Sequence, residues 1–305
     1  MLVRGNFSPL FRPGLRKDFL DSFQDWEPIW SRFLKESTTD LPEQRATIIA
    51  GLNRLYERGD GEPITYDDPR IGPVVQGVDR EFGVGFMLTK KTVEDDQYGK
   101  ANQGAKWLGR AARLTYEYRA AALLDDAFAG ATFKGIDNQP LISAAHTGIG
   151  TTAVLTNLPA APVGLSVGGI TALQDLAQNM KDENNDPIIM WPGKLVIGNA
   201  AGQYNKALQI FGSDKEPFTA DNQDNAIKKR MNIQQGNIVM NPYMLSTTNY
   251  FLVDDRLNDA QMVIRRPVTM DDSYDFNTDA MLNKVTTRFL IWFVNWRGWV
   301  GSNPS

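Results

Sequence analysis

Ser166 is the residue whose neighbours most resemble those of a catalytic nucleophile. It lies at the centre of Gly164-Leu165-Ser166-Val167-Gly168, which matches the nucleophile elbow of serine hydrolases. That motif needs a strand before it, a helix after it and a histidine later in the chain. The only histidine, His146, precedes the serine. A glycine-rich turn before a helix near Ile170 is therefore favoured, and a soluble α/β hydrolase using Ser166 is the alternative.

A second glycine-rich segment could hold a phosphate group. Gly198-Asn199-Ala200-Ala201-Gly202 follows a predicted strand at Lys194–Ile197 and precedes a helix in which Tyr204, Leu208 and Phe211 share one face. That context resembles a dinucleotide loop, but the middle glycine of the fingerprint is missing. An ordinary strand-to-helix turn is favoured, and a nucleotide-binding enzyme using Gly198 belongs to the same alternative.

The composition removes several other kinds of site. The 305 residues include no cysteine and one histidine, which excludes disulfides, thiolate metal sites and a cysteine nucleophile. The acidic clusters at 182–186 and 271–272 lack the spacing of a calcium loop. We therefore predict no catalytic residues, no metal site and no cofactor, and a chain that is not an enzyme. The formal net charge of -4 provides no general attraction for nucleic acid.

The uncharged stretch 138–174 invites a membrane interpretation. Pro159, Pro162 and Gly164 divide it into pieces shorter than the roughly 20 apolar residues of a membrane-spanning helix. We expect turns and short strands buried in protein, with no membrane partner. No apolar targeting segment is visible at the N-terminus.

The element most able to organise the chain is a helix predicted over residues 92–128. Thr92 and Asp95 form a variant of the capping box, and Gly130 is a plausible stop. At 1.5 Å per residue this helix would span roughly 54 Å, which is long for a domain of this size. Small or apolar residues recur on one face, at Ala101, Ala105, Leu108, Ala112, Tyr116, Ala120, Leu123 and Ala127.

Another face of the same helix is polar. We expect it to be mainly solvated, with contact to phosphate or to an acidic neighbour as the alternative. Its members are Gln103, Lys106, Arg110, Arg113 and Glu117.

The segments before this helix have little core of their own. Residues 1–16 lack periodicity. A short amphipathic helix, which Pro28 would bend, is predicted after them, with aromatic residues at helical spacing at Phe19, Phe23, Trp26, Trp30 and Phe33. We leave open whether they dock on a partner or on their own domain. Residues 46–91 predict a hairpin, in which a long turn-rich excursion precedes an alternating strand at 81–88. The rest is mostly β, and 285–294 predicts a central strand because it is apolar on both faces from Phe289 onward.

Four motifs, in this order and spacing, resemble the major head subunit family of Mu-like phages, and a fifth is similar to the closing segment of many tailed-phage capsid proteins. The resemblance covers about residues 80 to 301. The motifs are Thr92-Val93-Glu94-Asp95-Asp96-Gln97-Tyr98-Gly99 before the long helix, Asp137-Asn138-Gln139-Pro140-Leu141-Ile142-Ser143 with His146, Pro192-Gly193-Lys194-Leu195-Val196-Ile197, Asn241-Pro242-Tyr243-Met244-Leu245 with Tyr250-Phe251-Leu252, and Arg297-Gly298-Trp299-Val300-Gly301.

This resemblance implies an α+β chain with the Hong Kong 97-type capsid fold. Residues 1–45 would be the N-terminal arm and 46–91 the extended E-loop hairpin. Residues 92–135 and 260–305 would form the peripheral domain with its spine helix, and 136–259 the axial domain. The lysine-asparagine cross-link of one branch of the family is not carried over, because no matching motif is present.

The function implied by the resemblance is that of a major capsid protein, which self-assembles into the icosahedral shell around the DNA genome of a tailed bacteriophage. Its partners would be copies of itself in hexamers and pentamers, a separate scaffolding protein, a portal and decoration proteins. Double-stranded DNA would be enclosed without sequence-specific binding. The protein would assemble in the host bacterial cytoplasm and reside in the virion capsid.

A β-rich binding module, such as a tail or decoration protein, is a third hypothesis for the function of the chain. The residues expected to contact neighbouring subunits are Phe23, Trp26, Trp30, Phe82, Phe86, Arg110 and Arg113.

Overall fold

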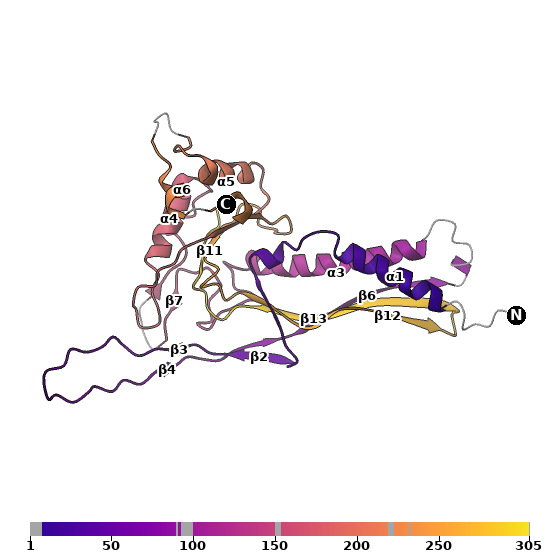
Figure 1. Ribbon diagram of the computed structural model, residues 1–305, viewed down its shortest axis with the longest axis horizontal. Coiled ribbons are helices and arrows are strands. Elements are labelled where there is room, and N and C mark those ends of the chain that lie inside the picture. The colour runs from indigo at the N-terminus through magenta and orange to yellow at the C-terminus, as the bar shows by residue number, and fades with distance from the viewer. Residues whose placement is uncertain are drawn as a thin grey trace.

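The computed structural model describes residues 8–89, 91–92, 100–149, 154–218, 223–231 and 233–304. Figure 1 shows a long layer of sheet and helix on one side, a helix-and-sheet body at its end, and a thin hairpin projecting beside the body. Two four-stranded sheets organise the described residues. The molecule is therefore elongated, as expected from its long helix.

The first sheet is long and mainly antiparallel. Its order is β1 (Lys35–Thr38), β12 (Gln261–Asp275), β13 (Ala280–Trp292) and β6 (Arg80–Thr89). β12 and β13 pair antiparallel from Gln261 opposite Trp292 to Asp275 opposite Ala280, and β1 runs parallel to β12. The predicted central strand is confirmed, since β13 has a partner on each side.

Two helices lie on this sheet. Helix α3 (Lys100–Asp125) runs along it, and α1 (Ser8–Phe23) packs on α3 (Figure 1). A buried cluster joins both helices to the sheet and contains Leu15, Phe19, Ala105, Leu108, Ala112 and Val285. The described members of the predicted apolar face of α3, from Ala105 to Ala127, are all buried.

The ends of the long helix can be compared only in part. α3 ends at Asp125, earlier than the predicted Phe128, and Gly130 follows with a positive φ of 62°. The Gly130 N–H donates to the Asp126 carbonyl at 2.9 Å, so Gly130 does help to terminate the helix. The predicted cap between Thr92 and Asp95 involves residues 93–99, which lie outside the described residues.

The arm departs from its prediction. We expected no periodic structure through residue 16 and a helix over 19–33. Instead α1 begins at Ser8 and ends at Phe23, and Trp30–Arg32 forms a separate 3₁₀ helix, η1. Pro28 lies in the bend between them. The aromatic residues thus keep a helical spacing in the sequence, although a turn interrupts the helix between Phe23 and Trp30.

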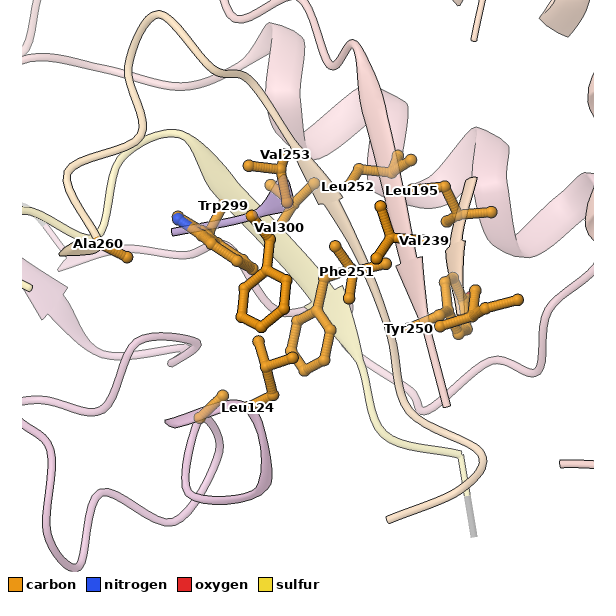
Figure 2. Packing of buried hydrophobic residues seen from close by; sticks show 14 of the residues in the cluster. Leu124, Leu195, Val239, Tyr250, Phe251, Leu252, Val253, Ala260, Trp299 and Val300 are labelled. Atoms are coloured by element: carbon orange, nitrogen blue, oxygen red, sulfur yellow. The ribbon is translucent and has the colours of Figure 1, made fainter. Parts of the chain in front are cut away.

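The second sheet forms the body. Its order is β10 (Ile238–Met240), β9 (Lys194–Ile197), β11 (Tyr250–Val253) and β14 (Trp299–Ser302). All four residues of β11 are buried, and Figure 2 shows Phe251 and Leu252 packed among Leu195, Val239 and Trp299. The remaining elements of the body are α4 (Val167–Gln178), α5 (Gln203–Gly212), α6 (Ala226–Met231), η2 (Gln235–Asn237), β7 (His146–Thr147) and β8 (Val154–Leu155).

One predicted boundary is corrected by this sheet. We expected residues 260–305 to join the spine helix, but β14 pairs antiparallel with β11, from Trp299 opposite Val253 to Ser302 opposite Tyr250. The chain end therefore completes the sheet of the body. Apolar residues alone did not indicate which sheet this short segment would join.

The hairpin also has other bounds than predicted, because it runs from Glu43 to Val78 instead of over residues 46–91. β2 (Glu43–Ala46) pairs with β5 (Val75–Val78), and β3 (Ile49–Ala50) pairs with β4 (Arg70–Ile71). The alternating segment at 81–88 instead belongs to β6, which pairs with β13 in the long sheet. Alternation identifies the buried face of a strand but not its partner.

Close packing of α1 on α3 depends on Gly109. A Cβ atom there would lie 2.5 Å from the Phe19 carbonyl oxygen and 3.0 Å from the Phe23 nitrogen. Alanine normally favours a helix over glycine by about 1 kcal/mol. Here it would push backbone against backbone, which costs about 1–3 kcal/mol.

We expect Gly109→Ala to lower the free energy of unfolding, measured by urea denaturation with circular dichroism. Gly168→Ala in α4 is the matched control, because a Cβ there meets nothing within 4 Å. The control should be neutral or slightly stabilising. Equal effects of the two variants would refute the close approach.

Candidate assembly surfaces

Ser166 has a structural task. Its φ of -158° and ψ of 170° place it at the N-cap of α4, and its Oγ accepts the Gly169 N–H at 3.1 Å. His146 is fully buried, and both ring nitrogens face other partners, with Nδ1 2.6 Å from Asp137 Oδ2 and Nε2 3.2 Å from Asn157 Oδ1. The described residues therefore hold no serine-histidine pair, and the hydrolase alternative receives no support.

The turn at Gly198 is likewise occupied by its own chain. Gly198 donates its N–H to the Asn249 carbonyl at 3.0 Å, and Ala200 donates to the Thr247 carbonyl at 3.1 Å. A Cβ at Gly198 would lie 2.2 Å from the Thr247 oxygen, so the glycine is needed for backbone packing. N–H groups used in this way are not available to cradle a phosphate.

The arm is held on α3 by one buried carboxylate. Glu117 is 0% exposed, and it accepts the N–H groups of Ile29 and Trp30 at 2.9 and 3.1 Å. These N–H groups lie at the start of η1, where a negative charge is favourable. One turn earlier on α3, Arg113 donates to the Trp26 carbonyl at 2.6 Å. Two charged side chains thus determine where the arm crosses the long helix.

The electrostatics of this pair are dominated by burial. Burial raises the pKa of Glu117 above its ordinary value, against the hydrogen bond from Ile29 and the charge of Arg113. Burial also lowers the pKa of Arg113, against the charge of Glu117. Desolvation outweighs attraction in both partners, so we infer that the pair contributes specificity of arm placement more than stability.

The polar face predicted for α3 is therefore only partly solvated. Gln103, Lys106 and Arg110 are exposed, whereas Arg113 and Glu117 are covered by the arm. Opposite charges four residues apart were the signal for this pair. That spacing does not distinguish a surface pair from one that a distant segment covers, which is why Glu117 was missed as a positioning residue.

The seven predicted contact residues divide by burial. Trp30 and Arg113 are 4% and 6% exposed, so both lie in the interior of their own subunit. Phe82 stacks on Phe289 with ring centroids 4.8 Å apart. An intersubunit role remains a prediction for all seven residues.

The hairpin presents the most exposed apolar side chains. Leu55 and Tyr66 are 101% and 91% exposed, and the segment around them has no strand structure from 51 to 69. Its base is fixed: a Cβ at Gly77 would lie 2.5 Å from Leu290, so β5 packs directly on β13. The exposed large side chains of this region are Leu41, Ile49, Leu52, Leu55, Tyr56, Ile64, Tyr66, Ile71, Val74 and Val78.

Among the described residues, no helix is long and apolar enough to cross a membrane. In that same part of the chain, no group of three or more His, Cys, Asp or Glu side chains could hold a metal ion.

A cap substitution separates the two interpretations of Ser166. We expect Ser166→Ala to cost about 1 kcal/mol of unfolding free energy, because the Gly169 N–H loses its acceptor, and Ser166→Asp to retain the cap. Chemical denaturation of both variants measures this. Loss of ester hydrolysis in Ser166→Ala at unchanged stability would instead restore the hydrolase alternative.

The buried carboxylate predicts a pH dependence with a defined sign. A raised folded-state pKa means that Glu117 contributes most stability below its unfolded value, near 4.5, and that this contribution is lost as pH rises through the folded value. Relative to Glu117→Gln, the native protein should therefore lose stability as pH rises above 4.5. Urea denaturation of both proteins at several pH values tests this. A native protein that gains stability relative to Glu117→Gln as pH rises would contradict the prediction.

Comparisons with known proteins agree with this architecture. The family described as "Phage capsid protein" matches residues 80–302, and the search of curated proteins found no match. The procapsid of bacteriophage JBD30 superposes with a TM-score of 0.56 at 13% identity, covering 100% of this chain and 77% of that chain. The capsid of cyanophage P-SCSP1u gives 0.57 at 14% identity, covering 90% and 87% respectively.

A third solved structure, a virus-like particle from Pyrococcus furiosus, gives a TM-score of 0.53 at 14% identity and covers 94% of this chain and 97% of that chain. At identities this low, the structural likeness shows the fold alone. It is the predicted α+β Hong Kong 97-type capsid fold. The family match extends from β6 to β14 and so includes the long helix, the whole second sheet and strands β6, β12 and β13 of the first sheet. The chain belongs to the phage capsid protein family.

Proposed function

We propose that this capsid protein is the major capsid protein of a tailed bacteriophage, and that its copies close an icosahedral shell around double-stranded DNA. The observation that carries the proposal is the projecting hairpin, whose large apolar side chains are mostly exposed in their own subunit. Apolar side chains that stay exposed do not stabilise an isolated subunit. Neighbouring copies that cover it gain buried apolar surface at every repeat of the contact.

The energetics favour many modest contacts. Fully burying a Leu or Phe-sized side chain contributes about 1.5–3 kcal/mol. A subunit with several such side chains on a preformed hairpin can bind its neighbours without a large change of its own fold. This is the behaviour needed by a protein whose role is structural and whose product is a shell.

The finer assignments extend the same proposal. Within the family, the order of the sequence motifs favours a Mu-like head subunit. Hexamers and pentamers of this chain, a separate scaffolding protein, a portal and decoration proteins would complete the particle. Assembly would take place in the host bacterial cytoplasm, and DNA would be enclosed without sequence-specific contacts, in keeping with the net charge of -4.

Removing the exposed apolar residues of the hairpin tests the proposal. We expect Leu55→Ser/Tyr66→Ser to abolish shells seen by electron microscopy when the chain is expressed alone or with its scaffolding protein. The melting temperature of the free subunit should not change, because both side chains are almost fully exposed. Normal shells from this variant would argue against the hairpin as an assembly element. A native chain that never assembles under either condition would overturn the proposed function itself.

A further inference from the structure

A groove at the base of the hairpin concentrates positive charge over an aromatic floor. It has a volume of about 300 Å³ and lies between β5, β13 and the turn at 132–134. Phe82, Phe133 and Phe289 contribute aromatic surface. Arg80, Arg119 and Lys134 line the same space, and no carboxylate does. We call these residues the cationic groove.

The charges of the cationic groove are not neutralised within the chain. Arg119 lies over the ring of Phe82, with Cζ 4.9 Å from the ring centroid. Burial, and then the positive charge of Arg80, lower the pKa of the Arg119 guanidinium. Among the described residues, no acidic side chain forms an ion pair with Arg80, Arg119 or Lys134.

Neighbouring cations on the same sheet are treated differently. Arg265 and Arg288 share the carboxylate of Asp79, at 3.3 and 3.0 Å. Arg266 pairs with Glu81 at 2.5 Å. Asp126, the acid nearest in sequence to the 132–134 turn, accepts three backbone N–H groups from residues 131–133. Each of these three neighbouring arginines thus has a carboxylate partner, unlike the cations of the groove.

The hairpin carries a complementary set of charges at its far end. We call residues 52–68 the loop tip. It has five carboxylates and two guanidinium groups, a formal net charge of -3. Arg54 pairs with Asp186 of the body, which leaves the outer part of the loop tip more acidic still.

The loop tip has a defined apex. The Glu62 N–H donates to the Gly59 carbonyl at 3.3 Å, and Gly61 has a φ of 79°, as required at the third position of a type II turn. Asp60 occupies the second position of that turn, and within the described residues neither Asp60 nor Glu57 has an ion-pair partner. Aliphatic and aromatic neighbours such as Leu55 and Tyr66 would suit the aromatic floor of the groove.

A subunit does not fill its own groove in this way. The groove contains β5, the base of the hairpin, whereas the loop tip is the end of the hairpin that points away from the long sheet (Figure 1). The complementary surfaces therefore belong to different copies.

We propose that the acidic loop tip of one copy docks in the cationic groove of a second copy, with Asp60 and Glu57 facing Arg80, Arg119 and Lys134. The inference rests on the proposed function and adds a residue-level partner for the hairpin. Charges of opposite sign would determine the register of docking, and apolar contacts would supply most of the affinity.

A charge-swap experiment tests the pairing. Arg80→Glu/Lys134→Glu reverses two exposed groove cations, and Glu57→Lys/Asp60→Lys reverses the loop tip. Each double variant alone should lower the yield of shells about tenfold or more, because like charges then face each other. The combined quadruple variant should recover most of the yield. Lys206→Glu/Arg230→Glu, on exposed positions of α5 and α6, is the matched control and should assemble normally.

A cross-link provides a second readout that does not depend on shell yield. The chain has no cysteine, so introduced thiols are the only ones present. In assembled particles, Asp60→Cys/Lys134→Cys treated with a short bismaleimide should give a ladder of covalent oligomers on a denaturing gel. Either single variant should give dimers at most, and Asp60→Cys/Lys206→Cys should give no ladder.

The outcomes separate the two proposals. Normal shell yield from the groove variant overturns the docking while the capsid function stands. Lack of recovery in the quadruple variant, together with no ladder from Asp60→Cys/Lys134→Cys, does the same. Shells that form normally but package less DNA would assign the cationic groove to phosphate and also overturn it. A native chain that forms no particles refutes the proposed function instead.

Discussion

Placement of the arm on the long helix depends on one buried carboxylate. Glu117 accepts two consecutive N–H groups of the arm, and Arg113 holds a carbonyl a few residues earlier. Only one crossing point satisfies all three backbone groups. Leu15 and Phe19 then meet Ala105, Leu108 and Ala112, and Gly109 permits the contact. The arm therefore has a defined path in the free subunit, and its residues Leu15, Phe19, Trp30 and Phe33 belong to the buried core.

This placement links the arm to the long sheet as well. Tyr116, one residue before Glu117, packs edge-on against Trp30 of the arm and against Phe289 of β13. Phe289 in turn stacks on Phe82 of β6. The aromatic rings thus connect four segments that are far apart in sequence. A shift of the arm would therefore move the floor of the cationic groove, because Phe82 and Phe289 form part of that floor.

Sequence reasoning recovered the elements with strong periodicity. The apolar face of α3, the central position of β13 and the strand at Lys194–Ile197 follow from the apolar patterns of these segments. Pairing over long separations could not be obtained in the same way. β6 and β14 each joined a sheet other than the one expected, because a short apolar segment fits any exposed sheet edge. Burial of Glu117 was missed for a related reason, since its cover comes from residues 88 and 87 positions away.

The hairpin combines a fixed base with an exposed end, and this division has a thermodynamic consequence. Gly77 brings β5 against Leu290, and Gly72 donates its N–H to the Ile48 carbonyl, so the strands leave the sheet in a set direction. Asn184 of the body adds hydrogen bonds to the carbonyls of Gly51 and Leu52. Ordering a free loop on docking would cost about 1–2 kcal/mol of backbone entropy per residue. Because the strands at the base of the hairpin are already oriented, that cost falls on the loop tip and not on the whole hairpin.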